Sequence, residues 1–162
     1  MTDATLRPDA GDAEEDERWM ARALREAARA LDSEEVPVGA VIVAAGTLVA
    51  RAHNQVRTLR DPTAHAEMIA ITQAAEALEN ERLVTATMYV TLEPCAMCAG
   101  ALVQARVDRI VFGAADPKAG ACGSGLDLPG HRVSNHRPQV TGGVLADASG
   151  ELLKEFFRAR RP

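Results

Sequence analysis

The sequence predicts a three-layer α/β fold, in which helices cover both faces of a mixed central sheet. Helical patterns alternate along the chain with short runs of β-branched residues, and two neighbouring runs are joined by a tight turn at Ala45-Gly46. Alternating strands and helices are typical of sheets covered on both faces, whereas a tight turn joins antiparallel strands. We therefore expect an antiparallel hairpin in the same sheet as parallel strands that are joined by helices.

The spacing of apolar residues predicts each element in turn. Residues 18–31 should form a helix, because apolar residues recur there every three or four positions. Two apolar runs at 38–44 and 47–53 should form the hairpin. Thr63 fits the N-cap of a second helix over 64–78. The remaining expected elements are a strand at 88–92, a helix from Pro94 to about Gln104, a strand at 109–113, a loop at 114–136, a short strand at 138–141 and a helix at 146–160.

Composition indicates one folded domain behind an acidic tail. The chain has 162 residues, of which 47% are hydrophobic and 25% charged, which suits a single core. Residues 1–17 hold seven acids and one base, a net charge of −6, while the whole chain carries −5. The rest of the chain is therefore close to neutral. We expect residues 1–17 to be a solvated, disordered tail and residues 18–162 to form the domain.

The sequence shows no sign of a membrane or export segment. No apolar run approaches the ~20 residues that span a bilayer, and the N-terminus lacks a basic start followed by an apolar stretch. We therefore expect a cytoplasmic protein. Its three cysteines, Cys95, Cys98 and Cys122, are too few and odd in number for a disulfide framework.

Two short motifs carry residues that can do chemistry. One is His65-Ala66-Glu67, near the start of the second helix, and the other is a C-x-x-C pair formed by Cys95 and Cys98. Cysteines three positions apart project from one side of a helical turn, and a helix N-terminus lowers the pKa of a thiol. With His65 they form a zinc-binding set that leaves the fourth position to a water of pKa ~7. Glu67 is placed to move a proton between that water and a substrate.

Other interpretations of these residues stay open at this level. A C-x-x-C pair can be a redox centre, although no thioredoxin-like pattern surrounds this one. A structural zinc site would need a fourth ligand, for which His53, His131 and His136 are available, but it would leave Glu67 without a role. A single histidine or glutamate would usually be an ordinary helix residue. The catalytic hypothesis therefore depends on the combination.

Together the motifs match the H-x-E and P-C-x-x-C signature of the zinc deaminases that act on nucleobases. Between about residues 18 and 161 the chain resembles the bacterial tRNA adenosine deaminases of the cytidine deaminase-like superfamily. The two motifs mark the whole superfamily. Asn135-His136 and the C-terminal run 156–161, with the sequence FFRARR, resemble the tRNA enzymes more narrowly.

The resemblance implies a fold, a cofactor and a reaction. It implies a cytidine deaminase-like sandwich, with one Zn²⁺ per subunit held by His65, Cys95 and Cys98 and with Glu67 as the proton shuttle. The implied reaction is the hydrolytic deamination of adenosine to inosine at the wobble position of tRNA anticodons. Deamination of a free base or nucleoside, such as guanine, cytosine or cytidine, is the alternative. A non-catalytic RNA-binding protein stabilised by zinc is more remote.

The same resemblance implies how substrate and partner are bound. Asn54 would hydrogen-bond the flipped base, and the Ala66 backbone N–H would help to orient it. Phe157, Arg160 and Arg161 are candidate RNA contacts beside the site. The family is commonly homodimeric, so a homodimer is expected here.

Overall fold

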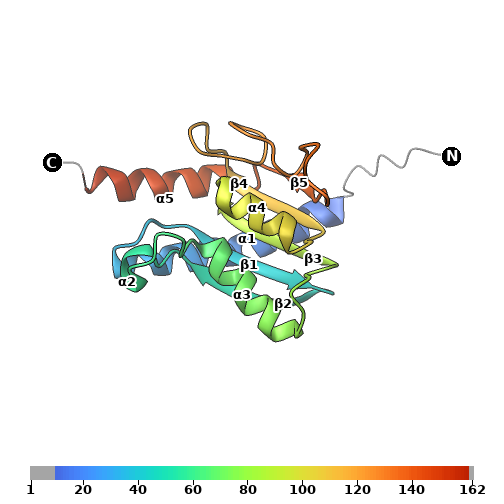
Figure 1. Ribbon diagram of the computed structural model, residues 1–162. Coiled ribbons are helices and arrows are strands. Elements are labelled where there is room, and N and C mark those ends of the chain that lie inside the picture. Colours follow the sequence, from blue (N-terminus) through green and yellow to red (C-terminus); the bar gives the residue numbers. More distant parts are fainter. Residues whose placement is uncertain (1–9, 161–162) are drawn as a thin grey trace.

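A five-stranded mixed sheet lies between two layers of helices in this computed structural model, which describes residues 10–160 (Figure 1). The three-layer α/β prediction is confirmed. The elements in chain order are α1 (Ala10–Ala30), the short 3₁₀ helix η1 (Leu31–Ser33), β1 (Gly39–Ala44), β2 (Thr47–His53), α2 (Val56–Leu59), α3 (Ala66–Leu78), β3 (Ala86–Leu92), α4 (Ala96–Gln104), β4 (Arg109–Ala114), β5 (Gln139–Thr141) and α5 (Ala146–Arg158).

The strand order is β2-β1-β3-β4-β5. β1 is antiparallel to both β2 and β3, whereas β3, β4 and β5 are parallel to one another. The predicted hairpin is confirmed, and both residues of its turn, Ala45 and Gly46, have left-handed backbone angles, with φ of 51° and 74°. This turn geometry matches the twist of the strands that it joins. The parallel arrangement brings the carboxyl ends of β3 and β4 to the same edge of the sheet.

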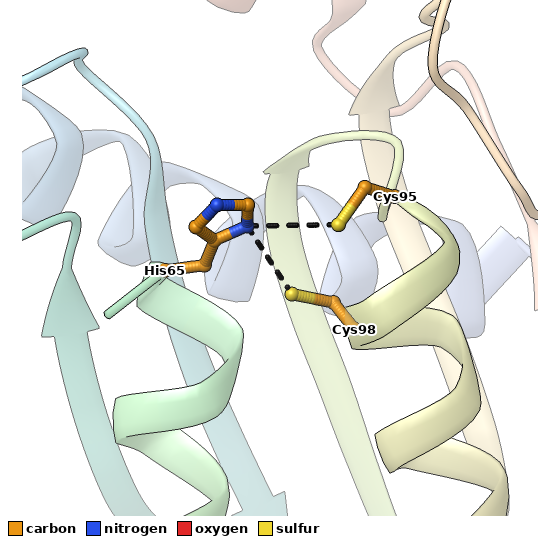
Figure 2. Close-up of side chains that lie close together, drawn as sticks. All are labelled: His65, Cys95 and Cys98. Atoms are coloured by element: carbon orange, nitrogen blue, oxygen red, sulfur yellow. Dashed lines mark hydrogen bonds between the residues drawn. The ribbon is translucent and has the colours of Figure 1, made fainter. Parts of the chain in front are cut away.

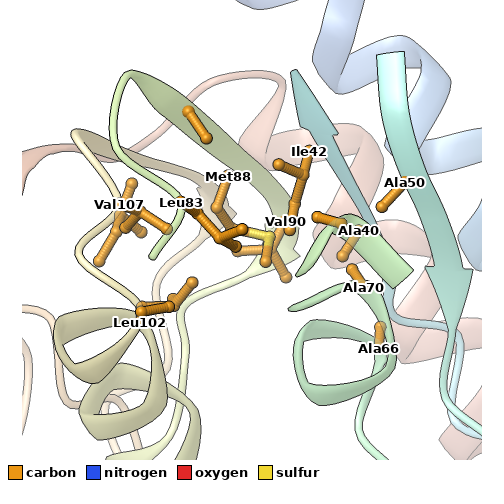
Figure 3. Packing of buried hydrophobic residues seen from close by; sticks show 14 of the residues in the cluster. Ala40, Ile42, Ala50, Ala66, Ala70, Leu83, Met88, Val90, Leu102 and Val107 are labelled. Atoms are coloured by element: carbon orange, nitrogen blue, oxygen red, sulfur yellow. The ribbon is translucent and has the colours of Figure 1, made fainter. Parts of the chain in front are cut away.

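α3 and α4 cover one face of the sheet and enclose the larger apolar core (Figure 3). The strands contribute alternate residues to this face, including Ile42, Met88 and Ile110, as the period of a β-strand requires. α3 contributes small residues to it, and Leu102 of α4 is fully buried. The helix that begins at the His65 motif and the helix that begins at the C-x-x-C motif therefore lie on the same side of the sheet.

α1 packs on the opposite face of the sheet, where Met20 and Ala23 contact Val41 and Tyr89 in a second core cluster. The approach is close at Gly39, because a Cβ atom there would lie 2.1 Å from the backbone oxygen of Ala23. α5 packs on the same face of the sheet beside β4. Within residues 10–160, no helix is long and apolar enough to cross a membrane.

The N-terminal helix begins earlier than predicted. α1 starts at Ala10, and the side chain of Asp16 is only 4% exposed. Its carboxylate accepts hydrogen bonds from both terminal nitrogens of Arg109, at 2.9 and 2.8 Å, and from the Tyr89 hydroxyl at 3.0 Å. The prediction of a solvated tail is therefore wrong for residues 10–17, because an acid among them is paired with the sheet. Residues 1–9 lie outside the described part of the chain.

Two local predictions also need correction. The short helices η1 and α2 were not expected, and the N-cap of α3 is His65 rather than Thr63. The Thr63 backbone N–H and hydroxyl both donate to the Asp61 carboxylate, at 2.8 and 2.7 Å. Asp61 thus closes a turn of its own before the helix begins, which is a common use of aspartate next to proline.

Candidate metal and catalytic site

The N-termini of α3 and α4 bring His65, Cys95 and Cys98 together (Figure 2). His65 is the N-cap of α3 and Cys95 is the N-cap of α4, both with extended backbone angles, while Cys98 lies in the first turn of α4. Cap residues stand at the end of a helix, so their side chains are free to point toward a neighbouring element. The partial positive charge of both helix ends also favours thiolates at this point.

The distances fit a single metal ion. His65 Nδ1 lies 3.6 Å from Cys95 Sγ and 3.4 Å from Cys98 Sγ, and the three ligand atoms all lie within 4.8 Å of one another. Zinc bonds of ~2.3 Å to sulfur and ~2.0 Å to nitrogen place tetrahedral ligand atoms roughly 3.5 Å apart. Two sulfurs and one imidazole at this spacing are a donor set that suits zinc.

A closed four-residue site is not present in the described part of the chain, because no fourth histidine, cysteine or carboxylate joins the group. The three histidines proposed for that role have other contacts. His53 Nδ1 contacts the Asn54 carbonyl, His131 Nδ1 accepts a bond from the Val133 N–H, and His136 Nε2 contacts the Val107 carbonyl. The arrangement is that of a site with three protein ligands, which leaves one position for water or substrate.

The two thiols differ in their acidity. A hydrogen bond with the Cys98 thiol lowers the pKa of Cys95 to about 5; burial opposes this shift, and the Cys98 backbone N–H and His65 support it. The same bond, together with burial, raises the pKa of Cys98. The pair therefore carries a thiolate at neutral pH, and a bound cation would deprotonate the second thiol as well.

Glu67 is the second residue of α3, and only 4% of it is exposed. Burial raises the pKa of this carboxyl, and the nearby His65 and the Cys98 thiol act in the opposite direction without cancelling the shift. A carboxyl with a raised pKa can take a proton in one step and return it in the next.

A cavity of about 470 Å³ opens beside these residues. This volume is in the range of sites that bind small molecules. Asn54, His65, Glu67 and Cys95 line it together with apolar side chains. Asn54 Oδ1 accepts a hydrogen bond of 2.8 Å from the Ala66 backbone N–H. Because the oxygen is engaged in this way, the Nδ2 group remains as the donor for a ligand.

The candidate RNA contacts lie at different places. Phe157 is 50% exposed and lines a neighbouring hollow of about 880 Å³ rather than the cavity itself. Arg160 lines both spaces, and its guanidinium lies 3.6 Å from the ring centroid of Phe156. Arg161 lies outside the described residues. The structure thus places Arg160, but not Phe157, at the cavity.

The Asn135-His136 element lies outside the cavity lining. Arg106 Nη1 donates to Asn135 Oδ1 at 2.5 Å, and His136 Nε2 lies 2.6 Å from the Val107 carbonyl. These contacts join the loop before β5 to the segment between α4 and β4. The element therefore stabilises the fold at the amino end of β4.

Sequence reasoning missed the role of Glu93, which is 2% exposed and also lines the cavity. Its carboxylate accepts bonds from three backbone N–H groups and from the Ser124 hydroxyl; the N–H donors belong to Asp116, Cys122 and Ser124. Although burial opposes ionisation, these bonds hold the pKa of Glu93 below its ordinary value. The signal was an acid between an apolar strand and Pro94, a position where a charge needs partners.

The close packing of Glu93 also explains why a glycine occupies position 120 in the loop that the carboxylate holds. A Cβ atom on Gly120 would lie 2.4 Å from the Glu93 carboxyl carbon, and Gly120 forms a β-bridge with Cys95. The carboxylate, the loop and the metal ligand are therefore packed against one another.

Comparison with known proteins agrees with this fold and site. The family model described as MafB19-like deaminase matches residues 14–161, which defines the protein as a deaminase. A tRNA-specific adenosine deaminase of Bacillus subtilis is 48% identical over 147 residues, 91% of each chain. Another, of Agrobacterium fabrum, is 48% identical over 143 residues, 88% of this chain and 94% of the relative. The chain belongs to the family of tRNA-specific adenosine deaminases.

Solved structures support the same assignment. One from studies of A-to-I editing by tRNA:A34 deaminases has a TM-score of 0.82 and 47% identity, and the match covers 84% of this chain and 99% of that one. A guanine deaminase from Nitrosomonas europaea is more distant, with a TM-score of 0.72, 27% identity and coverage of 86% and 83%. The deaminase of a free base is thus the less similar of the two.

Proposed function

We propose that the protein removes the amino group of adenosine at the wobble position of tRNA anticodons by hydrolysis of the C6–N bond, which gives inosine and ammonia. One observation carries this proposal: two sulfurs and an imidazole converge beside a buried carboxyl at the cavity, in a chain 48% identical to named tRNA-specific adenosine deaminases.

We assign one Zn²⁺ per subunit to His65, Cys95 and Cys98. The donor types and the distances of 3.4 and 3.6 Å between the imidazole and the sulfurs support this assignment. When bound, zinc supplies an acidic water as the nucleophile at neutral pH.

Glu67 moves the protons of the reaction. It takes one proton from the attacking water and delivers it to the ring nitrogen beside C6, while the water oxygen forms the new bond to C6. It then moves the remaining hydroxyl proton to the amine, the C6–N bond breaks, and ammonia leaves. Its burial and raised pKa support this role, since the carboxyl must hold a proton between the two steps.

Asn54 orients the base. Its Nδ2 group donates to a ring nitrogen of the flipped adenine, while the Ala66 N–H holds its Oδ1. Ala66 thus acts on the base through Asn54 instead of contacting it. A nucleotide in an anticodon loop is already single-stranded, so moving its base into the cavity costs little pairing energy.

The surface beside the cavity would hold the rest of the anticodon loop. We assign Phe157 to stacking on a base and Arg160 and Arg161 to phosphates. The exposed ring of Phe157 and the place of Arg160 at the cavity support the first two assignments. Lys118, Lys154 and Arg158 line the same hollow as Phe157, which favours an anionic partner.

We also propose that the enzyme is a cytoplasmic homodimer. The compartment follows from a tRNA substrate, and the dimer rests on the resemblance to the family. Light scattering of the purified protein tests the dimer, and a mass of one chain of 17.2 kDa would contradict it.

The decisive experiment incubates zinc-loaded protein with a tRNA that carries adenosine at the wobble position. Inosine should appear there, detected by nuclease digestion and mass spectrometry, and it should be absent from the same tRNA with guanosine at that position. Turnover of free guanine, cytosine or cytidine without any tRNA activity would overturn the proposal in favour of a deaminase of free bases.

A further inference from the structure

Glu35 is a buried carboxylate that the proposed reaction does not use. It lies between η1 and β1, is 2% exposed and lines the cavity. Its Oε1 atom accepts a bond of 3.1 Å from the Arg57 N–H. Its Oε2 atom accepts two bonds of 2.7 Å, from the Thr58 N–H and the Thr58 hydroxyl. The partners are 22 and 23 positions away along the chain, so this contact joins two distant segments.

The donors belong to α2, which is only four residues long. The first N–H groups of a helix have no partner within it and are usually satisfied by the side chain of the N-cap residue. The N-cap residue of α2, Gln55, makes no such bond. Arg57 and Thr58 occupy the second and third positions of the helix, where a capping side chain normally accepts. Glu35 therefore caps α2 from another part of the chain.

α2 forms a wall of the cavity. Val56 and Arg57 both line it, two and three positions after Asn54. Asn54 itself has other anchors, because its N–H donates to the Val38 carbonyl and its side chain accepts from Ala66. The Glu35 contact ties the wall at 56–57 to a distant segment, whereas two further bonds there, from the Asp61 N–H to the Val56 carbonyl and from the Arg60 N–H to the Arg57 carbonyl, stay within the same turn. Bonds to a charged acceptor are roughly twice as strong as neutral ones, so removal of the charge should loosen this wall.

We propose that Glu35 is a positioning residue, which holds α2 as the wall against which the substrate nucleotide fits. This inference rests on the proposed function. Although burial acts in the opposite direction, the bonds from Thr58 and Arg57 lower the pKa of Glu35, so the carboxylate is charged at neutral pH. Because Glu35 is not one of the three metal ligands, its loss should change the fit of the substrate and not the metal content.

The test measures steady-state kinetics of Glu35→Gln on the wobble-adenosine tRNA, with Asp32→Asn as the matched control. Asp32 is an exposed acid in the same connection and does not line the cavity. Glu35→Gln should raise KM on the order of tenfold, as misplacement of a binding wall does, with a smaller change in kcat and an unchanged zinc content. Thr58→Val, which removes only the hydroxyl donor, should raise KM by a smaller factor. Asp32→Asn should match the wild type.

A second measurement follows hydrogen exchange of the amides at 55–60. These should exchange faster in Glu35→Gln than in the wild type, while those of α3 keep their rates. A wild-type KM in both Glu35→Gln and Thr58→Val, or a fall in kcat alone, would overturn the inference. If the wild-type protein forms no inosine, the proposed function fails instead, and the exchange data still decide whether Glu35 holds α2.

Discussion

Glu67 and Glu93 line the same cavity and are both buried, yet their pKa values shift in opposite directions. Burial dominates at Glu67 and raises its pKa. At Glu93, burial is outweighed by four hydrogen bonds from the loop at 116–124, and the pKa is lowered. Burial alone therefore does not determine what a carboxyl does in this protein. The number of donors aimed at it separates a proton carrier from an anchor that is charged at neutral pH.

The largest expected effect is on turnover in Glu67→Gln. Loss of a general acid and base typically slows a reaction on the order of 10² to 10⁴-fold. The variant should still bind one zinc per chain, because Glu67 is not part of the ligand group. Inosine formation and elemental analysis of the same sample check both statements. Glu76→Gln, an exposed acid on the same helix, is the control and should keep full activity. Activity near wild type in Glu67→Gln would remove the proton shuttle from the mechanism.

The next effect distinguishes ligand thiols from other buried thiols. Cys98→Ala should lose its zinc and its activity and should unfold at a lower temperature, because metal binding is coupled to folding. Cys122 is also buried, but it is not one of the three grouped ligands. Cys122→Ala should therefore retain the metal. Elemental analysis and thermal unfolding of both variants provide the check, and equal metal loss in the two would contradict the assigned site.

Glu93→Gln should affect stability more than chemistry. An amide offers one acceptor oxygen where the carboxylate offers two, so part of the donor set loses its partner. The expected loss is about 2 kcal/mol at pH 7. Urea unfolding of the zinc-loaded proteins measures it. A free energy of unfolding equal to that of the wild type would mean that Glu93 is not an anchor.

The pH dependence of this difference follows from the lowered pKa of Glu93. A group whose pKa is lower in the folded state adds stability that is fully present above its unfolded pKa and is lost as the pH falls through the folded value. The advantage of the wild type over Glu93→Gln should therefore be complete at pH 7. It should shrink below about pH 4.5, near the ordinary pKa of a glutamate. A difference that grows toward acid pH would have the wrong sign.

The smallest expected effect comes from Ser124→Ala, which removes one of the four donors to Glu93. The Ser124 hydroxyl lies 2.5 Å from Glu93 Oε1. Its loss should cost about 1 kcal/mol of stability and move the pKa of Glu93 upward, toward its ordinary value. Carbon-detected NMR titration of the carboxyl follows this movement directly. A stability loss as large as that of Glu93→Gln would show that the hydroxyl, and not the backbone donors, holds the charge.

The metal site could be predicted because its geometry is largely local. Cys95 and Cys98 share one helical turn whatever the rest of the fold does, and the helix patterns placed His65 near a second helix start. β2 spans residues 47–53 as predicted, since alternation and a two-residue turn fix a hairpin from nearby residues.

The remaining features depend on partners far apart in sequence. Glu35 meets α2 across 22 positions, Glu93 meets Ser124 across 31, and Asp16 meets Arg109 across 93. No periodic pattern in the sequence predicts contacts between residues so far apart. For the same reason the composition of residues 1–17 predicts a solvated tail, although one of their acids, Asp16, pairs with Arg109 of the sheet.

The alanines of α3 connect the interior of the protein to its chemistry. Ala66, Ala70 and Ala74 are fully buried and recur about once per turn, so α3 presents a row of small side chains to the core. His65 caps this helix, whereas both sulfurs belong to α4. The height of α3 above the strands thus sets how far the imidazole can reach. A bulkier residue at Ala74, more than two turns along α3 from His65, should shift His65 relative to the two sulfurs and would weaken zinc affinity without altering any ligand.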